Sequence, residues 1–293
     1  MKKLLLIVNP VAGRTSIAGQ MINVIDTFVK ADYDVTVVTT QSEVHLIKTV
    51  ESRAQEFDLI VCCGGDGTLS LTVDSVCKID NRPLIGYIPC GTTNDFAKSR
   101  GISSVPVEAA EQIAEGATHS VDVGFFGGKA YIYVAAFGVF SDTSYATPRQ
   151  LKQDIGRAAY LLEGVKSFVN KTNYHVKFET DREVLEGDFM YGMFSNTRRV
   201  GGFQLPIISN FTVDDGMIDV TLVKAVKTPE DNTKLLNALI TQHADDNMIY
   251  QFRASKITYE SDVEIPWSLD GEYGGAFKKH NLEIKSGCID MLY

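Results

Sequence analysis

The first 120 residues alternate short apolar runs with segments of helical periodicity. The apolar runs are continuous and partly β-branched, as expected of strands buried on both faces. They are Leu4–Val8, Val35–Val38, Asp58–Cys63 and Leu84–Ile88. Between them, apolar spacing of three and four predicts helices over Ile17–Lys30, Val44–Gln55 and Thr68–Cys77. This alternation predicts an α/β domain with a mainly parallel sheet and flanking helices.

The pattern changes near residue 121, where short β-like runs separated by Gly and Asp turns take over. The runs are Tyr131–Val134, Tyr174–Glu179, Phe189–Phe194, Ile218–Val223 and Lys256–Glu260, with helices expected near Gly156–Val169 and Asp231–Gln242. They predict a β-rich, sandwich-like second half. No linker rich in Pro, Gly or Ser intervenes. We therefore expect two closely packed domains, 1–121 and 122–284, with residues 285–293 a candidate to complete the first.

Length and charge narrow the function classes. A chain of 293 residues suits about two domains. With 37 acidic and 28 basic residues the net charge is −9, which argues against nonspecific nucleic-acid binding and against a polybasic membrane anchor. The apolar run at the start of the chain is too short for a signal peptide. We therefore expect a cytoplasmic protein without a transmembrane helix.

The five cysteines form an odd set without a CxxC pair, so neither a disulfide framework nor a zinc site is indicated. They are Cys62, Cys63, Cys77, Cys90 and Cys288. In a reducing compartment we expect them to be small core residues.

The clearest chemical signal is the segment GGDGT at residues 64–68, between a predicted strand and a predicted helix. Its glycines allow close backbone approach to a ligand, and the N–H groups of a helix start form a phosphate cradle. Asp66 would repel a phosphate unless a divalent cation lies between them. The segment therefore favours a metal–nucleotide site, with an ordinary turn carrying a surface aspartate as the alternative. Neither GxGxxG nor a P-loop is present.

Four other segments are ambiguous when taken singly. They are Asn9–Arg14, Gly91–Phe96, Asp214–Asp219 and Ser268–Glu272. An Asn-Pro turn, a helix cap and Asp-Gly turns are ordinary features with no ligand. The same segments also carry the amides, hydroxyls and carboxylates that bind phosphate or Mg²⁺.

Taken together, these segments resemble a known family. NPxxG at 9–13, GGDGT at 64–68, GTTNDFA at 91–97 and LDGE at 269–272 follow one another in this order. The combination is similar to the bacterial soluble lipid kinases of the diacylglycerol kinase catalytic-domain family, which share their fold with NAD kinases. GGDGT also occurs in NAD kinases and phosphofructokinases, whereas GTTNDFA and the DGE turn favour a lipid kinase. The resemblance covers nearly the whole chain.

The resemblance implies a role for each matching residue. Asp66 and Asp95 would act with Mg²⁺–ATP, Glu272 would be the general base, and Asp270 would tie that base to a structural metal. The ATP site would be lined by Asn9, Pro10, Gly13, Arg14, Thr40, Gly64, Gly65, Asp66, Gly67, Thr68, Leu69, Ser70, Leu71 and Thr92. The structural Mg²⁺ would be held by Asp215 and the carbonyls of Thr212 and Met217, with a water link to Asp122.

The implied activity is transfer of the γ-phosphoryl group of Mg²⁺–ATP to a lipid hydroxyl, with diacylglycerol giving phosphatidic acid. The alternatives are another lipid acceptor (phosphatidylglycerol, undecaprenol or a sphingoid base), NAD kinase activity, and a noncatalytic lipid- or nucleotide-binding regulator. Segments 139–144 and 206–210 depart from the family pattern, which leaves the acceptor open. A lipid kinase would touch the membrane transiently, and a homodimer is compatible with this picture.

Overall fold

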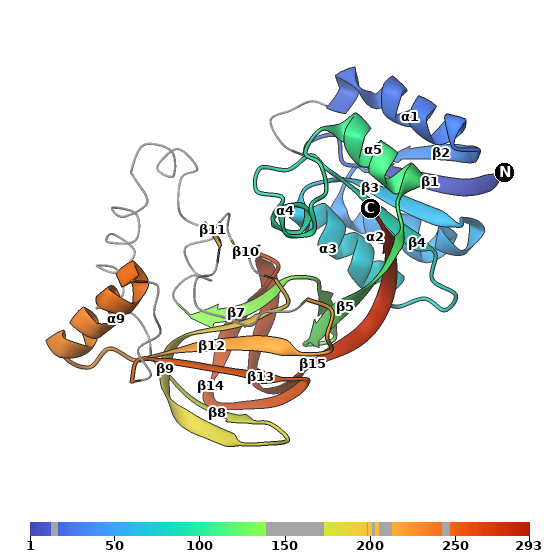
Figure 1. The fold of residues 1–293 in the computed structure, drawn as a ribbon. Coiled ribbons are helices and arrows are strands. Elements are labelled where there is room, and N and C mark those ends of the chain that lie inside the picture. Colours follow the sequence, from blue (N-terminus) through green and yellow to red (C-terminus); the bar gives the residue numbers. More distant parts are fainter. Residues whose placement is uncertain (13–16, 139–172, 198, 201–202, 205–212, 242–246) are drawn as a thin grey trace.

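The computed structural model describes residues 1–12, 17–138, 173–197, 199–200, 203–204, 213–241 and 247–293, which form two lobes (Figure 1). The first lobe is a parallel sheet covered by helices on both faces. The second is antiparallel and rich in β-structure. The predicted fold class is confirmed.

The first lobe follows the predicted strand–helix alternation. Its sheet has the order β4-β3-β1-β2 and is parallel throughout, made of β1 (Lys2–Val8), β2 (Tyr33–Thr39), β3 (Leu59–Gly64) and β4 (Leu84–Pro89). The helical elements are η1 (Ile17–Gly19), α1 (Met21–Lys30), α2 (Glu43–Arg53), η2 (Ala54–Glu56), α3 (Asp66–Val76), α4 (Asp95–Arg100) and α5 (Pro106–Glu115). Helices α1 and α5 cover one face, and α2 and α3 cover the other (Figure 1).

The second lobe is built from antiparallel pairs. Its elements are β5 (Thr118–Phe126), β6 (Lys129–Tyr131), β7 (Val134–Gly138), β8 (Tyr174–Glu179), β9 (Val184–Ser195), β10 (Arg199–Val200), β11 (Phe203–Gln204), β12 (Ile218–Lys224), α9 (Pro229–Thr241), β13 (Ile249–Ala254), β14 (Lys256–Leu269) and β15 (Glu272–Leu292). Strands β7 and β8 each pair with both β9 and β14, so the four strands enclose a core. Trp267 lies in this core, with Phe126, Phe137, Phe194 and Tyr259 packed around it.

Strand β15 connects the two lobes. It begins in a hairpin with β14, pairs antiparallel with β5, and ends beside β4 in parallel, with Met291 opposite Ile85. The end of the chain therefore adds a strand to the first lobe's sheet. Residue 121 lies inside β5 rather than in a linker. The domain bounds at 121 and 284 stay a prediction.

Two local predictions differ from the structure. The run Tyr131–Val134 is not one strand, because the chain bends at Ile132 and Tyr133, whose N–H groups turn toward a carboxylate described below. Helix α5 was not predicted, although its buried positions Pro106, Ala109, Ala110 and Ile113 have helical spacing. The helix predicted at 156–169 lies outside the described residues. Within the described part of the chain, no helix is long and apolar enough to cross a membrane.

Candidate active site

Two glycine turns pack against each other at the carboxyl edge of the parallel sheet. One follows β3 and the other follows β4, and Cys90 donates its N–H to the carbonyl of Gly64 at 2.7 Å. A Cβ added to Gly91 would lie 2.6 Å from the Cα of Gly65. A Cβ on Gly64 would lie 2.4 Å from the hydroxyl of Thr68. Only glycine allows this approach, which brings the GGDGT and GTTND segments together.

The first strand contributes a third turn to the same edge. The Asn9 amide donates to the Thr68 hydroxyl at 3.1 Å, and its backbone N–H donates to the carbonyl of Cys63 at 2.9 Å. Thr40, after β2, is buried and bonded to the carbonyl of Val8. Pro10 is exposed beside Asn9. The four parallel strands thus end at one edge, where ligands of open α/β sheets bind.

Asp66 links two of these turns. Its carboxylate accepts hydrogen bonds from the Thr93 hydroxyl at 3.1 Å, the Asp95 N–H at 3.1 Å and the Phe96 N–H at 3.4 Å. Asp66 therefore caps the start of α4 from another segment of the chain. Burial and the neighbouring charge of Asp95 raise the pKa of Asp66, with burial the larger cause.

The donor set at this edge fits a divalent cation. Asp66 and Asp95 are both buried, and two like charges out of water are unfavourable without a compensating positive charge. Their carboxylates are hard oxygen donors of the kind Mg²⁺ prefers. In α3 the N–H groups of Thr68 and Leu69 donate to the carbonyl of Gly65 at 3.0 and 3.1 Å. The N–H groups before them, at the start of the helix, are the ones that a helix leaves without an acceptor of its own, and a phosphate bound at this edge would lie near them.

The remaining described residues predicted for the nucleotide site lie on α3 or in the turn after β4. Leu69 is fully buried in the core, and Leu71 is partly buried against it. Thr92 is exposed at the tip of the turn after β4. Gly13 and Arg14 lie outside the described residues.

Asp270 and Gly271 form the tight turn between β14 and β15. Both have positive φ, +49° and +87°, as the favoured two-residue hairpin turn requires. The Asp270 carboxylate accepts N–H groups of Ile132 at 2.7 Å and of Tyr133 and Val134 at 3.0 Å each. This explains the bend between β6 and β7.

A fourth donor to Asp270 comes from the other lobe. The Ser70 hydroxyl, on α3, donates to Asp270 at 2.8 Å. Burial raises the pKa of Asp270 to about 6, while its four donors favour the ionised form. The carboxylate is thus occupied in fixing the hairpin tip, and a link from it to a structural metal stays a prediction.

Glu272 lies over the GGDGT segment. It is the first residue of β15 and is exposed, and a Cβ on Gly67 would lie 3.7 Å from its Oε1. Partial burial and repulsion from Glu43 raise the pKa of Glu272. The hairpin therefore places this carboxylate beside the phosphate cradle, and no donor from the described residues is bonded to it. The structure thus brings together, at the carboxyl edge of the parallel sheet, four acidic residues that were predicted from distant segments. They are Asp66, Asp95, Asp270 and Glu272.

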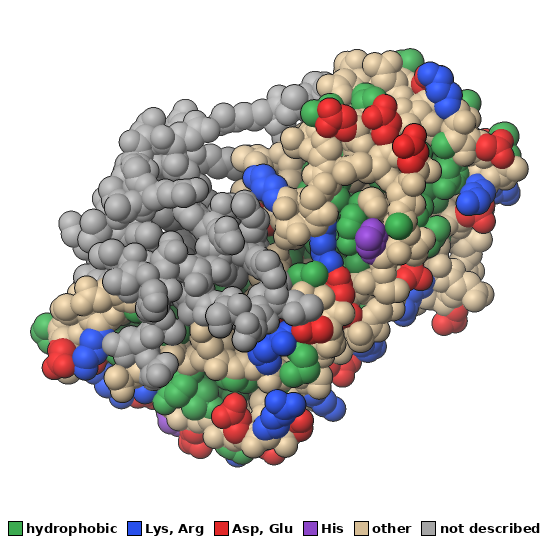
Figure 2. All heavy atoms as spheres, in the orientation of Figure 1, with side chains coloured by type: hydrophobic (Ala, Val, Ile, Leu, Met, Phe, Trp, Pro, Cys, Tyr) green, Lys and Arg blue, Asp and Glu red, His purple; other side chains and the backbone are tan. Residues whose placement is uncertain are grey.

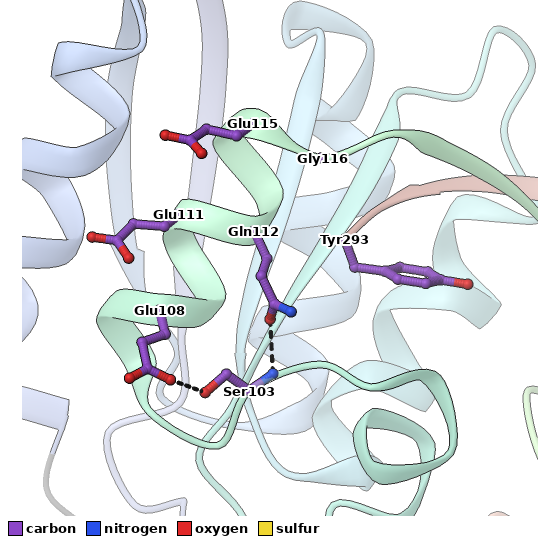
Figure 3. Close-up of a pocket in the computed structure, with 7 residues that line it drawn as sticks. All are labelled: Ser103, Glu108, Glu111, Gln112, Glu115, Gly116 and Tyr293. Atoms are coloured by element: carbon purple, nitrogen blue, oxygen red, sulfur yellow. Dashed lines mark hydrogen bonds between the residues drawn. The ribbon is translucent and has the colours of Figure 1, made fainter.

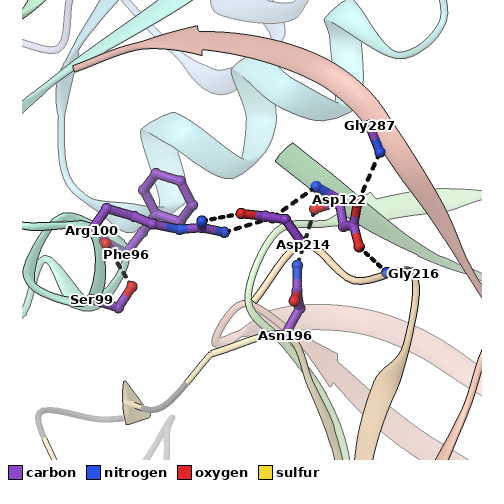
Figure 4. Close-up of polar contacts among 8 residues, drawn as sticks. All are labelled: Phe96, Ser99, Arg100, Asp122, Asn196, Asp214, Gly216 and Gly287. Carbon is purple, nitrogen blue, oxygen red and sulfur yellow. Dashed lines mark hydrogen bonds and ion pairs between the residues drawn. The ribbon is translucent and has the colours of Figure 1, made fainter. Parts of the chain in front are cut away.

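Asp122 lies in a second polar cluster (Figure 4). Its carboxylate accepts the N–H groups of Gly216 at 2.6 Å and Gly287 at 2.8 Å. Its own N–H donates to Asp214, which forms a two-pronged pair with the buried Arg100 of α4. Both oxygens of Asp122 are thus engaged in holding the 214–216 turn and β15 together.

Asp215 and Met217, the other described residues of the predicted structural Mg²⁺ site, contact each other next to Arg253. Asp215 pairs with Arg253 at 2.6 Å and accepts the Met217 N–H at 3.1 Å. Among the described residues, no group of three or more His, Cys, Asp or Glu side chains is arranged to hold a metal. Thr212 lies outside those residues, so the structural Mg²⁺ site stays a prediction.

A surface hollow of about 470 Å³ lies away from these residues, beside α5 (Figure 3). It is lined by Ser103, Glu108, Glu111, Gln112, Glu115, Gly116 and Tyr293. Acidic side chains gather over α5 on this face (Figure 2). An acidic hollow repels phosphate groups, and none of the predicted site residues lines it.

The fold and the edge just described define a phosphotransferase of the NAD kinase-like type. Residues 3–126 match the family model of the diacylglycerol kinase catalytic domain, and residues 135–293 match that of the YegS C-terminal NAD kinase beta sandwich-like domain. The chain therefore belongs to the diacylglycerol kinase family of lipid kinases.

Individual relatives agree with this membership. The chain is 32% identical to a diacylglycerol kinase of Bacillus subtilis (strain 168), covering 94% of this chain and 91% of that one. It is 28% identical to a diacylglycerol kinase of Staphylococcus carnosus (strain TM300), covering 97% and 93%. A crystal structure assigned to a diacylglycerol kinase of Bacillus anthracis str. Sterne superposes with a TM-score of 0.85 at 26% identity, covering 100% and 97%.

Some contacts that shape the site were not predicted from the sequence. Thr93 and Phe96 lie in the predicted 91–97 segment, but their hydrogen bonds to Asp66 were not predicted, and Arg100, which holds Asp214, was not singled out. For α3, the sequence does contain a pattern that indicates contacts with other segments. Asp66, Ser70 and Asp74 recur every four residues, and each contacts another segment: the 93–96 turn, Asp270, and the N–H of Ala130 at 2.7 Å. A polar stripe on an otherwise apolar helix indicates such a docking face.

Proposed function

We propose that this chain is a diacylglycerol kinase that transfers the γ-phosphoryl group of ATP to the free hydroxyl of diacylglycerol, giving phosphatidic acid. The position of Glu272 over Gly67 carries the proposal. It sets a carboxylate that can accept a proton next to a glycine cradle that can hold phosphates. The relatives described above are diacylglycerol kinases, which supports diacylglycerol as the acceptor.

In this proposal the acceptor hydroxyl lies between Glu272 and the γ-phosphate. Glu272 takes the proton, the hydroxyl oxygen attacks phosphorus, and the bond to the bridging oxygen breaks as ADP leaves. Asp66 and Asp95 would hold the Mg²⁺ of Mg²⁺–ATP, which when bound neutralises charge on the phosphates. The N–H groups of the GGDGT segment orient the phosphates, and Asp270 keeps the hairpin tip in place.

A labelling experiment tests the acceptor. The purified chain is incubated with γ-labelled ATP, Mg²⁺ and, separately, diacylglycerol, phosphatidylglycerol, undecaprenol, a sphingoid base or NAD. We expect label in phosphatidic acid. Label in another lipid or in NAD would replace the proposed acceptor, and ATP binding without transfer to any of them would favour a noncatalytic regulator.

A matched pair of variants tests the base. Glu272→Gln should keep ATP binding and lose transfer by about 10²-fold or more, since general-base catalysis contributes that much. Glu51→Gln, an exposed glutamate on α2, is the control and should keep full activity. Near-normal turnover of Glu272→Gln would remove this residue from the mechanism.

The lipid acceptor implies transient contact with a membrane surface. Co-sedimentation with diacylglycerol-containing vesicles tests this contact, and we expect the bound fraction to rise with the diacylglycerol content. Equal binding to vesicles without diacylglycerol would show that binding to the vesicle surface does not depend on diacylglycerol.

A further inference from the structure

Two thiols face each other at the C-terminal end of α3. Cys77 caps the helix, and its Sγ lies 3.7 Å from the Sγ of Cys288, which is 211 positions further along the chain. Both cysteines are free. They lie beyond Asp66, Ser70 and Asp74 on the helix, outside the proposed catalytic machinery.

An irregularity in β15 brings Cys288 to this place. The pairing of β15 with β5 shifts between Lys285 and Ile289, and Gly287 within the shift has a φ of +56°. The bulge directs the Gly287 N–H to Asp122 (Figure 4), and the next residue, Cys288, meets the end of α3. A bulge re-aims side chains in this way.

A guanidinium group bridges the two cysteines. Arg82 donates to the carbonyl of Cys288 at 2.6 Å, to its Sγ at 3.5 Å and to the carbonyl of Cys77 at 3.1 Å. A positive charge at this distance stabilises a thiolate, which is the reactive form of cysteine. Either thiol can donate in the contact between the two sulfurs, and once Cys288 is ionised Cys77 is the donor.

The two thiols differ in their surroundings. The hydrogen bond from Cys77, followed by the charges of Arg82 and Lys285, lowers the pKa of Cys288 to about 6 against the opposing effect of burial. The bond to Cys288, burial and the charge of Asp74 raise the pKa of Cys77. Arg82 reaches the Sγ of Cys288 at 3.5 Å but contacts Cys77 through its carbonyl, so Cys288 is the nucleophile of the pair.

We propose that Cys77 and Cys288 are an oxidisable thiol pair, which hydrogen peroxide converts into an intramolecular disulfide between α3 and β15. The Cys288 thiolate attacks one peroxide oxygen, the O–O bond breaks, and hydroxide leaves, giving a sulfenic acid. The Cys77 thiol then attacks that sulfur, the S–O bond breaks and water leaves. The thiols lose two electrons, and the peroxide is reduced to two waters once hydroxide is protonated.

A second close pair shows why distance alone does not decide reactivity. Cys63 and Cys90, beneath the glycine turns, have Sγ atoms 3.2 Å apart, which is closer than the first pair. In the inner pair Cys63 is fully buried and Cys90 is 6% exposed, whereas in the outer pair Cys288 is 8% exposed and Cys77 is half-buried. Within the described part of the chain, no hydrogen bond from a lysine or arginine reaches either sulfur of this inner pair. It serves as the internal comparison.

The site is tested on the full chain with dilute hydrogen peroxide, followed by alkylation and peptide mapping by mass spectrometry. We expect one cross-linked peptide, Cys77 with Cys288, which dithiothreitol removes. The Cys63 and Cys90 peptides should stay alkylated. Failure to find the Cys77–Cys288 peptide, or equally fast oxidation of the inner pair, would overturn the proposal.

Single variants separate the two steps. Cys77→Ser should stop at a sulfenic acid on Cys288 that dimedone traps, and Cys288→Ser should leave Cys77 unmodified. Arg82→Gln should slow oxidation several-fold, and Arg82→Lys, which keeps the charge, should restore most of the rate. Circular dichroism verifies that each variant is folded. Unmodified Cys288 in folded Cys77→Ser protein, or equal rates for the two Arg82 variants, would contradict the assigned roles.

Discussion

The Ser70 hydroxyl donates a 2.8 Å hydrogen bond to the buried carboxylate of Asp270, 200 positions further along the chain. Ser70 is on the helix that begins with the GGDGT segment, and Asp270 is two residues before the proposed base. The bond therefore couples the phosphate cradle to the hairpin that carries Glu272.

Removing this hydroxyl tests the coupling. Ser70→Ala leaves Asp270 with three donors instead of four, and we expect a loss of about 1 kcal/mol of unfolding free energy, measured by urea titration. Since the Ser70 hydroxyl is bonded to the hairpin, kcat should fall while the KM for ATP stays near normal. Ser75→Ala on the same helix, whose hydroxyl donates to the carbonyl of Leu71 in the preceding turn, is the control. A large rise in the KM for ATP would instead favour the predicted ATP contact.

Asp270→Asn tests whether the hairpin tip needs a pure acceptor. Asparagine has the same shape, but its NH₂ group would face N–H donors of Ile132, Tyr133 or Val134. We expect a loss of about 1–3 kcal/mol of stability, because a buried donor is left unpaired. Activity should fall even at temperatures where the variant is fully folded. Wild-type stability in thermal and urea unfolding would contradict the anchoring role.

The pH profile tests the environment of Glu272. Repulsion from Glu43 adds to partial burial in raising the pKa of Glu272, and a base must be ionised to accept a proton. Activity should therefore fall as the pH drops through this raised pKa. Glu43→Gln removes the repulsion, lowers the pKa and should move the acid limb of kcat to lower pH. Glu51→Gln, on the same helix, should leave the limb in place, and a limb that moves equally in both variants would rule out a specific effect.

Gly91→Ala tests the contact between the glycine turns. The added methyl would lie 2.6 Å from the Gly65 Cα, so the two turns must separate. We expect about 1–3 kcal/mol of destabilisation and an ATP affinity reduced about tenfold, measured by urea unfolding and isothermal titration. Gly19→Ala is the control, since its Cβ meets nothing within 4 Å. Unchanged ATP affinity would mean that the turn spacing does not matter for the nucleotide.

The parallel lobe was predictable because its signals are local. The apolar runs of β1, β3 and β4 and the helical spacing of α2 and α3 follow from the burial of each element. The break at Ile132 was not predictable, because the run of apolar and aromatic residues continues through it. Its cause is a carboxylate about 140 positions away.

The cysteines show the same limit. Composition predicts small, mostly buried thiols, and Cys62, Cys63, Cys90 and Cys288 are buried while Cys77 is half-buried. Nothing in the spacing of Cys77 and Cys288 indicates that they meet, since the meeting depends on a bulge in β15 and on Arg82 between them.

The sequence by itself determined the fold class, the glycine turns and the set of carboxylates that carry the family resemblance. These depend on short-range periodicity and on backbone conformations that only certain residues adopt. The tertiary structure alone decided that Asp66 caps α4, that Asp270 gathers the N–H groups of another strand, and that Glu272 lies over Gly67. The physical reason is long-range strand pairing. Strands β3 and β4 lie side by side, so the turns that follow them meet, and the β14–β15 hairpin pairs with β7 before β15 runs on to β4.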